Sequence, residues 1–337
     1  MKKFSIVVLV LVTCILSCER GERPFPERDI TNAVVWGAGG GTDICNRVVS
    51  AEMASILDVN INVINKTGGV GGSVGMLYGY SQKHDGYTLT GLSESVVTAA
   101  VQGGWDKKME VWDFFIIAGS PDIISVTPDA PYTNLADLIE AAKAEPGSIK
   151  AGASAAGSIH HLNLLALENG TGAKFNFIPY PGSAPTQTAA MTGEITVVIT
   201  SVAEQQQLIR SEKLRPLGML IPDTFEVEGI GVIPSAFDPY PELSKYLPIS
   251  QSIGIAVPAD VPDTVKQAIT DAFKKALETE KVKTWAKENY YVISGKTGSE
   301  AREEFNNLES VFAWTLWKLG AAKVDPAKLG IPKPQSK

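Results

Sequence analysis

Three short loops rich in Gly, Ser and Ala are the parts of this 337-residue sequence whose residue types and spacing favour ligand chemistry. They cover residues 37–42, 154–158 and 180–185, and each follows a predicted strand and opens a predicted helix. Small residues let a ligand approach the backbone closely, and the free N–H groups and dipole of a helix N-terminus attract an anion. One such loop is an ordinary turn of an α/β protein, whereas three favour a cleft that binds an anion.

The sequence lacks the motifs of dinucleotide, nucleoside triphosphate and metal sites. Residues 37–41 do not hold the register of the GxGxxG dinucleotide motif, and no Walker lysine follows them. His160 and His161 are adjacent, so they cannot share one face of a helix as a pair of metal ligands would. The three cysteines show neither CxxC spacing nor a neighbouring His cluster. We therefore expect neither a metal nor a cofactor.

An enzyme is the alternative class of protein. Ser154 or Ser158 together with His161 would supply the nucleophile and base of a hydrolase or transferase. However, neither serine lies in a G-x-S-x-G elbow, and no Asp follows at a suggestive position. The pattern therefore favours a binding protein over an enzyme.

Length and composition describe an ordinary globular protein. A chain of 337 residues suggests two domains, and 44% hydrophobic with 20% charged residues excludes a disordered or fibrous chain. The formal net charge of −7 argues against a nucleic-acid partner, because phosphate binding needs clustered Lys and Arg.

The N-terminus predicts export and a lipid anchor. Lys2 and Lys3 precede a 14-residue apolar run, residues 4–17, which is too short to span a membrane and fits the core of a secretory signal. The run ends in Ile-Leu-Ser followed by Cys18, which resembles the lipobox of bacterial lipoproteins; the alternative is an ordinary signal peptide with an incidental Cys. We expect a signal peptide at 1–17, lipidation of Cys18, a tether at 18–27, and a place in the periplasm or at the cell surface.

Short apolar runs alternate with helical patterns along the rest of the chain. Strands are predicted at 33–36, 59–64, 88–92, 114–118, 123–127, 149–153, 175–178, 195–199, 216–220 and 253–257. Thr42 and Ser158 are candidate helix caps, and Gly320 is expected to end the last helix. The alternation predicts an α/β fold with mostly parallel sheets.

Besides residues 112–114 and 131–135, five segments match a known family in order and spacing. Residues 36–43 read Trp-Gly-Ala-Gly-Gly-Gly-Thr-Asp and are followed by Arg47, residues 65–75 form a second glycine-rich loop, and residues 85–88 read Asp-Gly-Tyr-Thr. Gly-Ser and His-Leu occur within 157–162, and Pro-Tyr-Pro-Gly-Ser-Ala forms 179–184. From about residue 30 onward the chain resembles the Bug/tricarboxylate-binding receptors, the extracytoplasmic solute receptors of tripartite tricarboxylate transporters. The sequence differs from the family pattern at Lys66-Thr67, where Arg-Pro is usual, and at Pro181, where Lys is usual.

The resemblance implies a two-lobed periplasmic binding protein of the second type, in which two strands form a hinge. Lobe one would comprise 28–125 and 252–337, and lobe two 126–251. Receptors of this family hold a carboxylate in the interlobe cleft with backbone N–H groups, hydroxyls and waters. The candidate ligand-binding residues are Gly39, Gly40, Gly41, Thr42, Ser93, Ser154, Ala155, Ser158, His161, Pro181, Gly182, Ser183, Ala184 and Ser201.

For several residues near these loops, we favour a structural role over contact with the ligand. Asp43 would repel an anionic ligand, so we expect it to brace the first loop. His161 is expected at the cleft edge or in packing more than on the ligand. Glu94 and Glu204 are expected to be solvated, and the alternative is that either meets an amino group on the ligand. Trp36 either lines the pocket or packs in the core.

The expected function is that of a non-enzymatic receptor for a mono-, di- or tricarboxylate. It would act as a monomer and deliver its ligand to the membrane subunits of a tripartite tricarboxylate-type transporter. The alternative is an orphan binding lipoprotein that serves sensing or contacts in the cell envelope.

Overall fold

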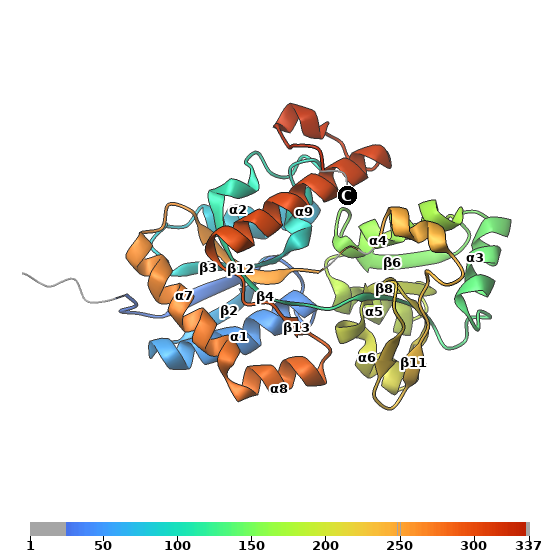
Figure 1. Cartoon of the computed structure of the whole chain (residues 1–337), viewed down its shortest axis with the longest axis horizontal. Coiled ribbons are helices and arrows are strands. Elements are labelled where there is room, and N and C mark those ends of the chain that lie inside the picture. The colour runs from blue at the N-terminus through green and yellow to red at the C-terminus, as the bar shows by residue number, and fades with distance from the viewer. Residues whose placement is uncertain (1–24, 248, 250, 335–337) are drawn as a thin grey trace, which may run out of the picture.

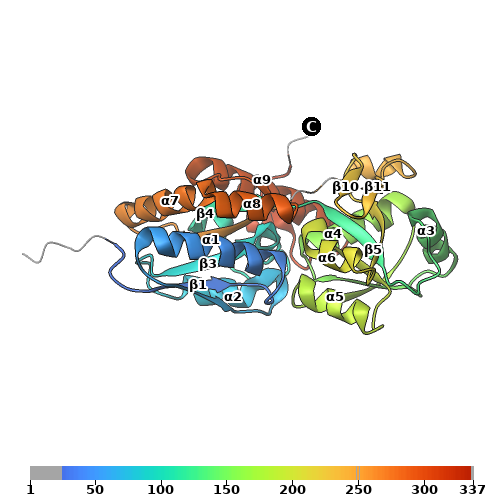
Figure 2. The same cartoon turned by 90° about the horizontal axis from the view of Figure 1, so that it is seen from below.

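The computed structural model describes residues 25–247, 249 and 251–334. The predicted signal peptide, Cys18 and most of the tether lie outside these residues. The described chain forms two α/β lobes side by side, each built on its own sheet (Figures 1 and 2). None of the described helices combines the length and the apolar content of a membrane span.

The first lobe is built on a six-stranded sheet in the order β13-β4-β12-β3-β1-β2. Its strands are β1 (Ile30–Val34), β2 (Ile61–Asn65), β3 (Thr88–Ser93), β4 (Trp112–Gly119), β12 (Ile253–Pro258) and β13 (Val292–Ile293). Its helices are α1 (Gly41–Leu57), α2 (Ser73–Tyr80), α7 (Asp263–Glu278), α8 (Glu280–Glu288) and α9 (Gly298–Lys318). Helices α1 and α7 pack together, and apolar side chains that include Val49, Met53 and Phe273 join them to the sheet.

The second lobe is built on a five-stranded sheet in the order β7-β6-β8-β5-β9. Its strands are β5 (Asp122–Val126), β6 (Lys150–Ser154), β7 (Asn176–Tyr180), β8 (Val197–Ser201) and β9 (Arg215–Met219). Its helices are α3 (Leu135–Ala144), α4 (Ile159–Thr171), α5 (Ser183–Met191) and α6 (Val202–Arg210). A two-stranded ribbon, β10 (Phe225–Val227) with β11 (Gly231–Ile233), lies beyond β9.

The chain crosses between the two sheets twice. It leaves the first sheet at the end of β4 and enters the second at β5, and it returns from the segment before β12. The two crossings touch, because the backbone N–H of Ser120 donates to Oε1 of Gln251 at 3.0 Å.

The lobes also contact each other away from the crossings. Ile159 and Leu162 at the start of α4 are fully buried in an apolar core otherwise built by the first lobe. Beside them, Oγ1 of Thr98 donates to the carbonyl of Gly157 at 2.8 Å, and the N–H of Ile159 donates to Oγ of Ser95 at 2.9 Å. These contacts hold the opening of α4 against the first lobe.

The α/β class and the two lobes are confirmed, with two differences in detail. Both sheets are mixed, because β12 pairs antiparallel with β3 and β4, and β5 pairs antiparallel with β8 and β9. The strands that follow the two crossings therefore run against their neighbours. Thr42 does not cap α1: the cap is Gly40, and Thr42 lies in the first turn. Ser158 caps α4 as predicted, and the last helix ends just before Gly320.

Candidate functional site

The N-termini of α1 and α5 face each other across the gap between the lobes. The loop at residues 37–42 is joined to the loop at residues 180–185, because the N–H of Gly37 donates to the carbonyl of Pro181 at 3.0 Å. Space is tight, since a β-carbon on Gly182 would lie 3.1 Å from the nitrogen of Gly37. These glycines therefore let two helix ends, each with a positive partial charge, approach across the cleft.

A small cavity of about 20 Å³ lies between these helix ends. That is little more than the space a water molecule needs. Its lining comes from both lobes and from the second crossing: Trp36, Gly40, Gly41, Thr42, Ser93, Glu94, Ser95, Ser154, His160, Gly182, Ser183, Glu204 and Gln251. Wider hollows of about 810 and 720 Å³ run along α9 and behind the crossings, away from the helix N-termini.

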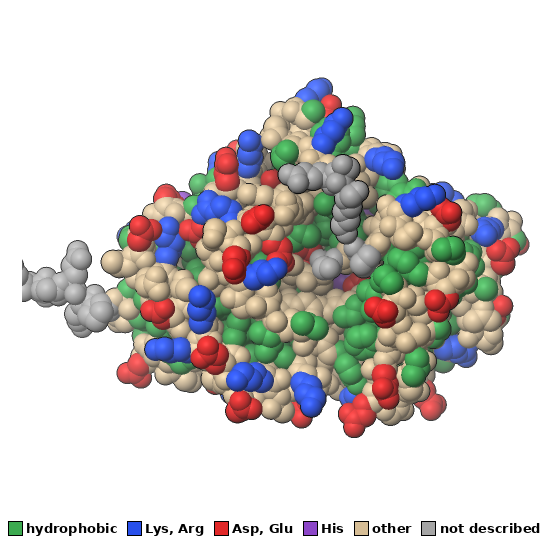
Figure 3. Space-filling model, viewed as in Figure 1, with side chains coloured by type: hydrophobic (Ala, Val, Ile, Leu, Met, Phe, Trp, Pro, Cys, Tyr) green, Lys and Arg blue, Asp and Glu red, His purple; other side chains and the backbone are tan. Residues whose placement is uncertain are grey.

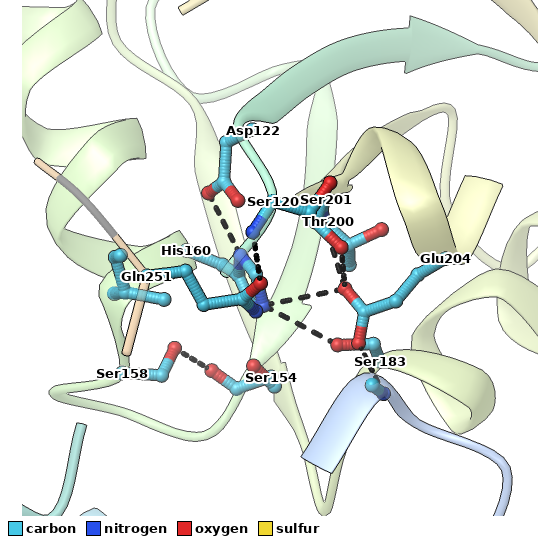
Figure 4. A network of polar contacts seen from close by, with 12 residues as sticks. Ser120, Asp122, Ser154, Ser158, His160, Ser183, Thr200, Ser201, Glu204 and Gln251 are labelled. Carbon is cyan, nitrogen blue, oxygen red and sulfur yellow. Dashed lines mark hydrogen bonds and ion pairs between the residues drawn. The ribbon is translucent and has the colours of Figure 1, made fainter. Parts of the chain in front are cut away.

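A buried polar network forms one wall of the cavity (Figure 4). Nδ1 of His160 contacts a carboxylate oxygen of Asp122 at 2.7 Å, and Nε2 lies 3.6 Å from Glu204. Burial alone would lower the pKa of His160, but the charges of Asp122, Glu204 and Glu94 and the hydrogen bond to Asp122 outweigh it and raise the pKa to about 9. His160 is therefore a buried cation held by carboxylates.

Glu204 reaches from the second lobe to the first. Its Oε1 accepts from the N–H of Gly41 at 2.7 Å, and its Oε2 accepts from the N–H and Oγ of Ser201 at 3.0 and 2.8 Å. Its side chain is 4% exposed. The expectation that Glu204 is solvated is therefore wrong, because the open helix end of α1 and the capping box of α6 both need an acceptor there.

Glu94 is also buried, contrary to the expectation. One oxygen accepts from the N–H and hydroxyl of Ser95 at 3.1 and 2.6 Å, and the other accepts from the N–H of Ser252 at 2.7 Å. Burial raises the pKa of Glu94, although these bonds oppose the change. The second crossing thus lies directly against this carboxyl group.

Asp43 makes the contacts that a bracing residue makes. Its carboxylate accepts from the N–H of Gly39 at 2.9 Å, from Asn65 at 2.8 Å and from Arg47 at 3.0 Å. Burial opposes ionisation, but these bonds lower the pKa of Asp43. Arg47 also donates to Asn65 and does not line the cavity. The loop is therefore fixed on the side away from the cleft.

The structure brings about half of the predicted site residues to the cavity. Those that line it are Gly40, Gly41, Thr42, Ser93, Ser154, Gly182 and Ser183. Those that are not part of its lining are Gly39, Ala155, Ser158, His161, Pro181, Ala184 and Ser201. The second set shapes the loops: Ser158 and Ser201 cap helices, and the carbonyl of Pro181 accepts from Gly37.

His161 packs and caps, while its neighbour His160 reaches the cavity. The ring of His161 stacks on Phe177 at 4.0 Å between centroids, and its Nδ1 accepts from the N–H of Gly157 at 3.0 Å. Burial lowers the pKa of His161 to about 4, which matches a neutral, accepting ring. Adjacent helical residues point to different faces, so only one of the two can enter the cleft.

Sequence reasoning missed His160, Ser95 and Gln251, and it placed Glu94 and Glu204 in solvent. Two signals were available. Ser201 and Glu204 have the S-x-x-E spacing of a capping box directly after a strand. Glu94 directly follows a buried strand in the lobe that carries the first loop. Trp36, left undecided, lines the cavity and also joins the core, with Nε1 donating to Oγ of Ser93 at 3.0 Å.

Two α/β lobes with helix N-termini meeting at an interlobe cavity define the architecture of a solute-binding protein. The chain belongs to the tripartite tricarboxylate transporter family receptors, whose family model matches residues 45–297. It is 28% identical over 305 residues to the UPF0065 protein in the gbd 5′ region of Cupriavidus necator, covering 89% of this chain and 90% of that one. It is also 28% identical over 225 residues to protein BugT of Bordetella pertussis, covering 65% and 68%.

Solved structures share the fold over nearly their whole length. A periplasmic transporter superposes with a TM-score of 0.80 at 25% identity, covering 89% of this chain and 100% of that one. An R. palustris protein with adipate gives 0.79 at 22% identity, covering 88% and 99%. MatC from Rhodopseudomonas palustris with bound malate gives 0.76 at 19% identity, covering 86% and 100%. The resemblance drawn from the five sequence motifs is thus confirmed.

Proposed function

We propose that this protein is an exported receptor that binds a small carboxylate between its lobes, through backbone N–H groups, hydroxyls and bridging waters. The observation that carries the proposal is the meeting of two helix N-termini at one cavity. Within the described residues, the N–H groups of Thr42 and Ser183 donate to no other protein group. Unpaired N–H groups at two facing helix ends form a site for an anion.

The free energies of the available hydrogen bonds agree with the affinity of an ordinary receptor. A hydrogen bond to a charged group contributes about 1.5–3 kcal/mol net. Two or three such bonds with the helix dipoles account for micromolar binding, which is about −8 kcal/mol. Two family structures were solved with adipate and with malate, and both ligands are carboxylates. The cavity lining needs no arginine for this chemistry.

The polar groups of the cleft support binding more than catalysis. The hydroxyl of Ser158 donates to the carbonyl of Ser154, and Nδ1 of His161 accepts from the N–H of Gly157. The nucleophile–base pair of Ser158 with His161 therefore does not form. Oγ of Ser183 lies 3.4 Å from Nε2 of His160, which is itself held by Asp122. At neutral pH His160 is protonated, because its pKa is raised to about 9, and a protonated ring cannot take the proton of a serine.

The proposal extends to the role of the protein at the membrane. A lipid on Cys18 would hold the receptor at the membrane surface, where it would act as a monomer. It would then deliver its ligand to the membrane subunits of a tripartite tricarboxylate-type transporter. This role rests on the family assignment and on the lipobox-like N-terminus.

Substitutions that add a bulky side chain at the cavity test the proposed binding site most directly. Calorimetry with a panel from acetate to citrate first identifies the best ligand. We expect Gly40→Val and Gly182→Val to abolish its binding, because each side chain fills the space between the helix ends. We expect Ser154→Ala to weaken it about tenfold, or ~1.4 kcal/mol.

The matched control for added bulk is Ala51→Val, on the exposed face of the same helix α1, which should bind as the unmodified protein does. Normal binding by both glycine variants would place the ligand elsewhere and overturn the proposed site. Loss of binding in the Ala51 variant would mean that the losses report unfolding and not the cleft.

A further inference from the structure

The N-terminus of α1 already holds a carboxylate that belongs to the protein. The N–H of Gly41 donates to Oε1 of Glu204 at 2.7 Å, across the gap between the lobes. The second oxygen of Glu204 is fixed by the N–H and hydroxyl of Ser201 within the capping box of α6. Glu204 is therefore preset by its own helix and meets α1 wherever the lobes are together.

The Glu204 carboxylate and the Tyr291 hydroxyl lie close against the backbone of Gly41. A β-carbon on Gly41 would lie 2.9 Å from Oε1 of Glu204 and 2.9 Å from the hydroxyl of Tyr291. Both groups thus press directly on the backbone of the first turn. Glu204 occupies one of the N–H groups to which a ligand carboxylate would otherwise bind.

The cavity lining contains more carboxyl groups than cationic side chains. Glu94 and Glu204 both line the cavity, and no Lys or Arg belongs to the lining drawn from the described residues. His160 supplies the positive charge of the lining, but it is shared with Asp122, which is 4% exposed and has one oxygen without a hydrogen-bond partner. A second carboxylate on a ligand would therefore meet the negative charge of Glu204.

The backbone donors left for a ligand lie at the two helix ends. They include the N–H groups of Thr42 and Ser183, which line the cavity and donate to no protein group in the described residues. A ligand carboxylate bound at these donors shares the cavity with Glu94 and Glu204. A protonated amine at the far end of that ligand would pair with these carboxylates, whereas a carboxylate would be repelled.

We propose that Glu204 makes the cleft selective for a ligand with one carboxylate and a protonated amine at its far end, over a dicarboxylate of the same length. The inference rests on the proposed function and names the ligand class of the same site. Glu204 acts as a specificity-determining residue, because it both occupies the α1 N-terminus and charges the wall of the cavity.

The test compares acids that differ only at the far end. Calorimetry measures succinate against 4-aminobutanoate, and adipate against 6-aminohexanoate, on the unmodified protein, on Glu204→Gln and on Glu226→Gln. Glutamine keeps the shape of Glu204 and, through its one amide oxygen, the capping box with Ser201. It removes the charge and leaves the N–H of Gly41 without its carboxylate acceptor. Glu226 is an exposed carboxylate of the second lobe, so its variant controls for net charge alone.

We expect the unmodified protein and Glu226→Gln to bind the amino acid of at least one pair tenfold or more tightly than the matching dicarboxylate. We expect Glu204→Gln to reduce that ratio to threefold or less. The proposal is overturned if the unmodified protein prefers the dicarboxylates, or if Glu204→Gln keeps the original ratio. Because each ratio is taken within one variant, an overall loss of affinity does not obscure it. Absence of binding for all four acids would instead count against the proposed function itself.

Discussion

At the scale of single residues, two adjacent histidines have opposite electrostatic roles. His160 is enclosed with Asp122, Glu204 and Glu94, whose charges raise its pKa to about 9 in spite of its burial. His161, one position on, stacks on Phe177 and has its pKa lowered to about 4 by burial. One helix thus presents a cation to the cleft and a neutral ring to the loop behind it.

This difference predicts how stability depends on pH. A histidine whose pKa is raised on folding stabilises the protein fully below about pH 6.5, and this contribution is lost as the pH rises towards 9. The loss is on the order of 3 kcal/mol. We therefore expect the melting temperature to fall between pH 6.5 and 9, and we expect His160→Gln to flatten this part of the profile. Calorimetric melting across this range is the measurement.

The matched control is His161→Gln. The lowered pKa of His161 means that its contribution is present above pH 6.5 and is lost as the pH falls towards 4. Its removal should therefore change the acidic side of the profile and leave the slope from pH 6.5 to 9 intact. An unaltered slope in His160→Gln would show that the ion pair with Asp122 does not stabilise the fold.

At the scale of elements, the cleft is an arrangement of helix N-termini. The loops of α1, α4 and α5 were predictable from sequence, because Gly and Ser after an apolar run mark both the turn and the helix start. Strand direction was not predictable, since the antiparallel pairing of β5 and β12 follows from crossings that join distant segments. The burial of Glu94 and Glu204 was not predictable from residue type, because a carboxylate is normally exposed.

The cap of α4 gives a test at this scale. The hydroxyl of Ser158 accepts from the N–H of His161 at 3.2 Å and donates to the carbonyl of Ser154. We expect Ser158→Ala to lower the free energy of unfolding by about 1 kcal/mol, the usual cost of a lost cap. Urea unfolding measures it, with Ser55→Ala on the exposed side of α1 as the control. Equal stability of the two variants would refute the capping role.

At the scale of the whole molecule, two lobes and a predicted anchor have to act together. The lobes meet at the cavity, at the opening of α4 and at the two crossings. Side chains of both charges are interspersed over the face in Figure 3, with neither sign gathered into one large patch. The proposed attachment to the membrane rests on the N-terminal lipid.

The anchor is tested by Cys18→Ala. We expect this variant to lose palmitate labelling and either to leave the membrane fraction or to remain unprocessed, because the cysteine of the lipobox-like motif is gone. Cys45→Ala is the control: Cys45 is fully buried in the first lobe, so its loss should leave the label in place. Persistent labelling of the Cys18 variant would rule out the lipoprotein assignment.

The central claim is that a carboxylate is held by the backbone of two facing helix ends. Amide NMR of the ¹⁵N-labelled protein, titrated with the tightest-binding acid, reports on these groups directly. We predict the largest saturable shifts at the N–H groups of Thr42 and Ser183, both with one dissociation constant equal to the calorimetric value. Shifts confined to the groove along α9, with these two amides unmoved at saturation, would contradict the account.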